Sequence, residues 1–77
     1  MELITFKTNI SNEKALQRVA PLLNNAVGSN NWQLDVSGAG NKLMVYSPGS
    51  INEMQVIDAV HKAGFYAVNI EDFYAIF

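Results

Sequence analysis

Hydrophobic and polar side chains alternate over the first residues of the chain and then follow a longer period. Over residues 2–8 one face carries Ile4, Phe6 and Thr8, and the other carries Leu3, Thr5 and Lys7. This period of two predicts a β-strand. Over residues 12–27 the apolar side chains fall within an arc of roughly 160° around a helix axis; they are Ala15, Leu16, Val19, Ala20, Leu22, Leu23, Ala26 and Val27. We therefore predict a helix that begins at Ser11 or Asn12, bends at Pro21 and stops at Gly28.

The remainder of the chain repeats this change of period. Alternation over residues 32–36 and 42–47, on either side of a glycine-containing loop at residues 37–41, predicts a β-hairpin. Ser50 to Glu53 match a capping box, in which the Ser50 side chain caps a helix and the Glu53 side chain reaches back. This second helix ends at Gly64, and its apolar side is formed by Met54, Val56, Ile57, Val60 and Ala63. Residues 65–70 are predicted to form a fourth strand.

The resulting order of elements, β-α-β-β-α-β, predicts an α+β fold of the ferredoxin-like type, with a four-stranded antiparallel sheet and two helices on one face. The helices would pack on Ile4, Phe6, Trp32, Leu34, Leu43 and Val45. A chain of 77 residues has no room for a second core, so we expect a single domain over residues 1–70.

Residues 71–77 form an apolar tail beyond this domain. Its hydrophobic side chains are Phe73, Tyr74, Ile76 and Phe77. Such a segment is too apolar to remain in water, and two arrangements would cover it. The tail either packs on the open face of its own sheet, near Leu3, Met44, Tyr46 and Val68, or contacts a second copy of the chain or another partner.

Composition and charge narrow the classes of function. Five Lys and Arg against seven Asp and Glu give a net charge of −2, which provides no basic surface for nucleic acid or for an anionic membrane. The absence of Cys excludes disulfides and thiolate metal sites. No signal peptide or membrane-spanning run is recognisable, so we expect a cytoplasmic protein.

Few residues of this chain are suited to catalysis. With one His and no Cys, an acid, a base and a nucleophile cannot be assembled, so we expect neither enzymatic activity nor a cofactor. Arg18 falls on the solvent side of the first helix and is expected to be a solvated charge. His61 falls in the last turn of the second helix, where a cation complements the helix dipole. The alternative is that His61 is a ligand or a pH-sensing residue.

The link from the first strand to the first helix carries the strongest resemblance to a known family. Residues 6–24, together with residues 32–36, 43–45 and 56–65, resemble the heavy-metal-associated domains of small metal carriers and metal-pumping ATPases. Members of that family have Met-x-Cys-x-x-Cys across this turn, and the two thiolates hold the ion. In this chain Ile10 occupies the Met position, Asn12 the first Cys position and Ala15 the second.

The resemblance implies a metal-transport scaffold that has lost its thiolates. Soft monovalent copper requires sulfur ligands, and we expect Asn12 to cap the helix instead. The domain would then be a protein-interaction module related to metal trafficking, with a partner of similar fold or a metal-transport protein. The expected partner-binding residues are Ile10, Ser11, Asn12, Glu13, Lys14 and Phe65. The alternative is a small-ligand regulatory module of the amino-acid-binding ACT type, which has the same topology.

Overall fold

The computed structural model describes residues 2–35 and 41–71 of the chain. They form four strands and two helices: β1 (Glu2–Thr8), α1 (Glu13–Val27), β2 (Trp32–Asp35), β3 (Lys42–Ser47), α2 (Glu53–Lys62) and β4 (Ala67–Asn69). The predicted β-α-β-β-α-β order is therefore confirmed.

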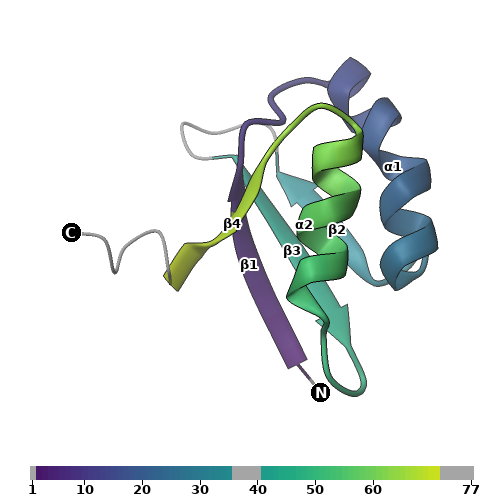
Figure 1. The fold of residues 1–77 in the computed structure, drawn as a ribbon, viewed down its shortest axis with the longest axis vertical. Coiled ribbons are helices and arrows are strands. Elements are labelled where there is room, and N and C mark those ends of the chain that lie inside the picture. Colours follow the sequence, from purple (N-terminus) through teal and green to yellow (C-terminus); the bar gives the residue numbers. More distant parts are fainter. Residues whose placement is uncertain (1, 36–40, 72–77) are drawn as a thin grey trace.

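The four strands form one sheet in the order β2-β3-β1-β4. Every neighbouring pair is antiparallel. β1 and β3 are the two central strands of the sheet. β4 forms the edge next to β1, and β2 forms the edge next to β3. Both helices cover the same face of the sheet (Figure 1). This is the ferredoxin-like arrangement that the sequence predicts.

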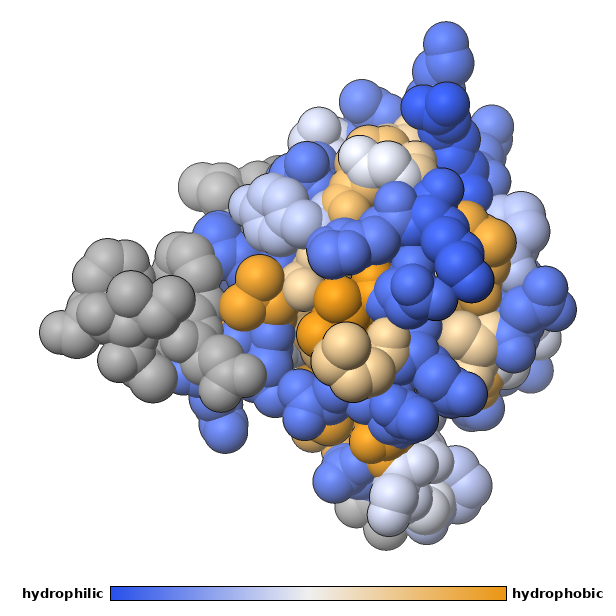
Figure 2. Space-filling view, viewed as in Figure 1, coloured by the Kyte–Doolittle hydropathy of each residue, from blue (hydrophilic) through white to orange (hydrophobic). Residues whose placement is uncertain are grey.

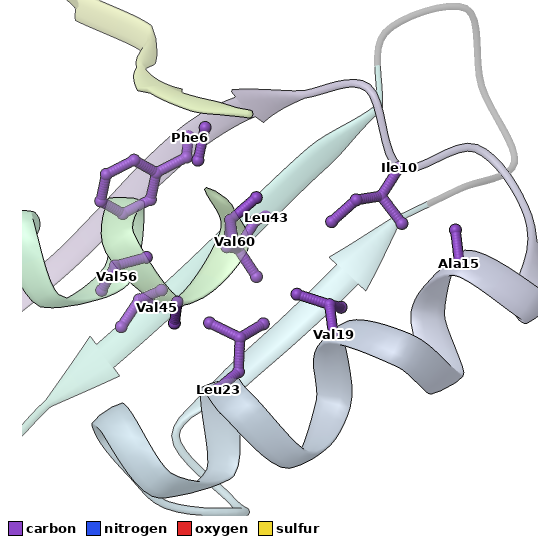
Figure 3. Packing of buried hydrophobic residues seen from close by; sticks show 11 residues of the cluster. Phe6, Ile10, Ala15, Val19, Leu23, Leu43, Val45, Val56 and Val60 are labelled. Atoms are coloured by element: carbon purple, nitrogen blue, oxygen red, sulfur yellow. The ribbon is translucent and has the colours of Figure 1, made fainter. Parts of the chain in front are cut away.

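The hydrophobic core lies between the helical layer and the sheet (Figure 3). Phe6, Leu43 and Val45 project from the sheet and are fully buried. They pack in one cluster with buried side chains of the helices, which are Ala15, Val19 and Leu23 of α1 and Val56, Ala59 and Val60 of α2. Ile4, Trp32 and Leu34 are partly buried against this cluster. The sheet face assigned from strand alternation is thus the core face.

α1 begins and ends as its sequence predicts. The Asn12 side chain caps the helix, since its Oδ1 accepts a hydrogen bond of 2.8 Å from the Ala15 N–H. The helix continues through Pro21, whose side chain is exposed. Gly28 then ends it with a φ of +96°, a backbone conformation that a Cβ would strain. The Gly28 N–H donates to the Asn24 carbonyl at 3.0 Å.

A side-chain hydrogen bond connects α1 to the neighbouring edge strand. Trp32, at the start of β2, donates from its indole Nε1 to the Asn24 Oδ1 at 2.8 Å. The indole ring is partly buried against the core cluster at the same time. This arrangement satisfies the polar atom of Trp32 while the rest of the ring remains in apolar surroundings.

The predicted capping box of α2 is wrong. The helix begins at Glu53, and its N-cap is Asn52, not Ser50. The Asn52 Oδ1 accepts hydrogen bonds from the N–H groups of Met54 and Gln55, at 3.1 and 3.4 Å. The Glu53 side chain does not reach back along the chain but accepts a hydrogen bond of 2.9 Å from Asn69 Nδ2. The pair Glu53–Asn69 therefore links the start of α2 to the end of β4.

This correction gives a direct prediction for stability. Asn52→Ala should lower the free energy of unfolding by about 1 kcal/mol, because the Met54 N–H loses its acceptor and the Gln55 N–H keeps only the Asn52 carbonyl. Ser50→Ala is the matched control and should change it by less than about 0.5 kcal/mol, as for an ordinary surface site. Urea unfolding followed by circular dichroism measures both. A larger effect of Ser50→Ala than of Asn52→Ala would contradict the assignment of the cap.

The prediction that Met54 lies on the apolar side of α2 is also wrong. Its side chain is 69% exposed, whereas Ala59 is 6% exposed and belongs to the core. The reason is angular: Met54 precedes the buried Val56 by two residues, which is about 200° around the helix. Val56 and Val60 are buried, and Ile57 and Ala63 are partly buried, as predicted.

β4 is shorter than the predicted strand at residues 65–70. It covers only Ala67–Asn69, and the backbone of Ile70 and Glu71 is helical. Ala67 is buried, and the next positions on the same face are Asn69 and Glu71, which are polar. A continued strand would bring Glu71 toward the core, so the core face of this strand has no further apolar side chain to bury after Ala67.

Two predictions concern parts of the chain that lie outside the described residues. Val36 and most of the hairpin loop belong to residues 36–40, and the apolar side chains of the tail belong to residues 72–77. The two arrangements expected for the tail therefore stay predictions.

Candidate functional site

Two loops far apart in the sequence meet at one end of the sheet. The first joins β1 to α1, and the second joins α2 to β4 (Figure 1). A hydrogen bond connects them, since the Tyr66 N–H donates to the Asn9 Oδ1 at 2.9 Å. This contact brings Phe65, which precedes Tyr66, next to the beginning of α1.

A surface pocket of about 320 Å³ lies between these loops, and we call it the loop-edge pocket. It is lined by Asn12, Lys14, Ala15, Arg18 and Phe65. Four of these residues come from the start and first turns of α1, and Phe65 closes the pocket from the second loop. The pocket thus lies between the aromatic side chain of Phe65 and the N-terminal part of α1, which carries the cationic side chains of Lys14 and Arg18.

The two positions that the resemblance assigns to metal-binding Cys are occupied by a helix cap. The Asn12 side-chain oxygen is engaged by the Ala15 N–H at 2.8 Å. The Ala15 side chain is only 6% exposed and has no donor atom. Across residues 2–35 and 41–71, no group of three or more His, Cys, Asp or Glu side chains is placed to hold a metal ion. The expectation that Asn12 caps the helix is confirmed.

Ile10 is not part of an accessible surface, although we predicted it as a partner-binding residue. Its side chain is fully buried and points from the first loop toward α1, where Ala15 and Val19 lie (Figure 3). The Ile10 N–H donates to the buried hydroxyl of Thr8 at 3.3 Å. Ile10 therefore closes the core beneath the loop, and its contribution is structural instead of the predicted partner binding.

The other predicted partner-binding residues are placed together. Ser11, Asn12, Glu13 and Lys14 are exposed at the beginning of α1, and Phe65 is partly buried beside them. Arg18 is also exposed and lines the pocket, one helical turn after Lys14. Arg18 is solvated as predicted, but it also belongs to the lining of the pocket. The four-residue spacing from Lys14 was the signal that the two cations share one side of the helix.

His61 does not line this pocket. It is exposed in the last turn of α2, next to Lys62. Lys62 forms an ion pair of 3.1 Å with Asp58, one turn earlier. The position of Lys62 at the helix C-terminus is the one that the helix dipole favours.

A second hollow, of about 260 Å³, lies between the two helices. Its apolar lining comes from Leu22, Ala26 and Ala59. Figure 2 shows apolar surface over the middle of the helical layer, bordered by hydrophilic side chains. No aromatic side chain is among the described residues that line this hollow, and its rim includes both Asp58 and Lys62. The loop-edge pocket, with an aromatic side chain and charges of one sign, is the better-defined site.

Comparison of this chain with family models, with curated proteins and with solved structures gave no match. Within the described ranges, no helix combines the length and the apolar character that crossing a membrane requires. We therefore infer a function from the residues of the site itself.

Proposed function

We propose that this chain is a non-catalytic protein-interaction module that binds an acidic partner surface through the loop-edge pocket and its rim. The single observation that carries this proposal is the position of Phe65 against Lys14 and Arg18. A partly buried aromatic side chain flanked by cations is typical of the centre and border of a protein interface.

The chemistry of the rim supports an acidic partner. Lys14 and Arg18 lie on the same side of α1 and project from a domain whose net charge is −2. Glu13 is adjacent in sequence, but it does not line the pocket. Carboxylates of a partner would be attracted to this local excess of positive charge, which favours encounter and fixes orientation.

The resemblance to heavy-metal-associated domains suggests where such a partner belongs. In this proposal the domain keeps the docking edge of a metal-trafficking scaffold and holds no thiolate-bound ion. Its partner is a domain of similar fold or a metal-transport protein. The loss of both Cys positions to a capping pair, Asn12 and Ala15, is compatible with a role in recognition and not in ion transfer.

Charge reversal in the rim tests the proposal. Lys14→Glu and Arg18→Glu should each weaken binding of a captured partner at least tenfold, equivalent to about 1.4 kcal/mol. Affinity capture with quantitative mass spectrometry, followed by titration of the purified partner, measures the change. The binding should also weaken as salt is raised, because exposed charges are screened.

Lys62→Glu is the matched control for these variants. It makes the same change in charge at a residue that does not line the loop-edge pocket, and it removes only an exposed ion pair with Asp58. Phe65→Ala is a second probe of the pocket, interpreted only if the variant remains folded. If every captured partner binds Lys14→Glu, Arg18→Glu and Lys62→Glu equally well, the loop-edge pocket is not the docking site.

A further inference from the structure

The outer edge of β1 is paired over only part of its length. On one side β1 pairs with β3 from Glu2 to Lys7. On the other side its pairing with β4 extends only from Phe6 to Thr8. The short β4 therefore leaves residues 2–5 without a neighbouring strand among the described residues, as Figure 1 shows beside the N-terminal half of β1.

The register shows which backbone groups point toward this vacant side. Successive residues of an antiparallel strand direct their N–H and C=O groups to opposite neighbours. Tyr46 of β3 donates its N–H to the Asn31 carbonyl, so its backbone groups point toward β2 and not toward β1. Leu3 lies opposite Tyr46, and its backbone N–H and C=O therefore point away from β3. Thr8 donates to the Asn41 carbonyl, which places even-numbered residues of β1 toward β3. Leu3 and Thr5 therefore direct their backbone groups toward the outer edge.

A groove of about 410 Å³ follows this edge. One wall is formed by residues 2–5 of β1, and the other by Glu53 and by Asn69 to Glu71. The described residues that line the groove include three acidic residues, Glu2, Glu53 and Glu71, and no basic residue.

Hydrogen bonds hold two of these carboxylates in place. Glu2 Oε1 accepts from the Ile51 N–H at 2.6 Å, and Glu53 Oε1 accepts from Asn69 Nδ2 at 2.9 Å. Both donors are neutral groups, so neither hydrogen bond brings a positive charge to the groove. The groove therefore combines a strand edge with a fixed negative potential.

We propose that residues 2–5 of β1 bind an extended partner segment that carries Lys or Arg side chains, which adds a strand to this edge of the sheet. The backbone groups of Leu3 and Thr5 supply the hydrogen bonds, as in other cases of strand addition. Glu2, Glu53 and Glu71 supply the preference for cations. The exposed Leu3 side chain, 56% accessible, gives an adjoining apolar contact.

The acidic charge of the groove disfavours two other occupants, a second copy of the chain and the chain's own C-terminal residues. A second copy paired through β1 would bring the acidic residues of both grooves together. The chain's own C-terminal residues begin with Asp72, directly after Glu71, and contain no Lys or Arg. A basic segment of another protein fits the groove better than either.

The test uses the full chain labelled with ¹⁵N and two short synthetic peptides. One peptide alternates Val with Lys, and the other alternates Val with Glu. We expect the Lys peptide to shift the amide resonances of Leu3 and Thr5 and to bind at least fivefold more tightly than the Glu peptide at low salt. Glu71→Gln should weaken binding of the Lys peptide, because it removes one charge of the groove.

Leu3→Pro and Leu3→Ala separate the backbone contribution from that of the side chain. Proline removes the outward N–H, which an edge position tolerates, whereas alanine retains it. Binding of the Lys peptide should be lost in Leu3→Pro and largely kept in Leu3→Ala, with both variants folded by circular dichroism. Equal binding to the two variants would overturn the proposal.

Three further outcomes would also overturn it. The first is equal binding of the two peptides, and the second is resonance shifts confined to the loop-edge pocket. The third is shifts of Leu3 and Thr5 that appear on concentrating the free chain, which would assign the edge to a second copy. Lys14→Glu should leave peptide binding unchanged, so this result is independent of the function proposed for the loop-edge pocket.

Discussion

Replacing Phe6 with alanine should lower the free energy of unfolding by about 3–5 kcal/mol, the cost typical of removing a large buried side chain. Phe6 is fully buried and packs in the one cluster that includes buried side chains of both helices. A domain of 77 residues has a total stability of only about 4–12 kcal/mol at ordinary values per residue. We therefore expect Phe6→Ala to unfold much of the population at 37 °C. Urea unfolding followed by circular dichroism measures the loss.

Leu3→Ala is the matched control for Phe6→Ala. Leu3 lies on the same strand but on the opposite face of the sheet, where its side chain is 56% exposed. Its truncation should change the free energy of unfolding by less than about 1 kcal/mol, because little apolar area is lost from a packed environment. Similar losses for Phe6→Ala and Leu3→Ala would contradict the assignment of the core face.

The double variant Asn12→Cys with Ala15→Cys should acquire tight binding of monovalent copper. The two positions are connected by the capping hydrogen bond of 2.8 Å, so two thiols placed there begin close together. A helix N-terminus lowers the pKa of a Cys thiol and favours the thiolate that copper binds. We expect an increase in copper affinity of at least a thousandfold over the unmodified chain, which should show no submicromolar binding. Competition with a chromogenic copper chelator measures both affinities.

The control for this variant replaces the same two residues with serine. Asn12→Ser with Ala15→Ser keeps a good N-cap residue but provides no sulfur. It should bind copper no better than the unmodified chain. If the Cys variant binds no more tightly than the Ser variant, the turn does not have the geometry of a metal-binding loop, and the resemblance to heavy-metal-associated domains loses its main support. One tight equivalent of copper bound by the unmodified chain would contradict the assignment of Asn12 as a simple cap.

Most of the fold follows from periodicity along the chain. The alternation of Ile4 and Phe6 with Leu3 and Thr5 assigns β1 and its core face, because a strand places successive side chains on opposite sides. The long apolar arc of α1 likewise predicts the helix and the side that it buries. The helix forms through Pro21, although proline is unfavourable within a helix. Both signals depend on many residues at once, so one exception does not change them.

The local predictions that failed depend on one or two residues each. Ser50 and Asn52 are both good N-cap residues, and the sequence alone gives no preference between them. In the structure α2 begins at Glu53, so Asn52 is the residue in the N-cap position. The Glu53 carboxylate accepts a hydrogen bond from Asn69 at the end of β4. That second contact joins residues 16 positions apart and is invisible to a local pattern.

The candidate site was predictable in part for the same reason. The cap at Asn12 is a local feature, so it is predictable from the residue type at the start of the helix. The contact between Asn9 and Tyr66, which brings Phe65 to α1, joins residues 57 positions apart and follows only from the fold. The burial of Ile10 also depends on the fold, because a loop residue has no periodic partner that would reveal which side it faces.

Trp32 is the sole tryptophan of the chain, and its indole is held between β2 and α1 by the hydrogen bond to Asn24. Its fluorescence therefore reports on one packing contact, the one between α1 and the edge strand β2. Detachment of α1 would hydrate the ring and shift its emission to longer wavelength, even while the rest of the sheet remained paired. Tryptophan emission recorded together with far-ultraviolet dichroism would thus distinguish loosening of one helix from cooperative unfolding, without any added label.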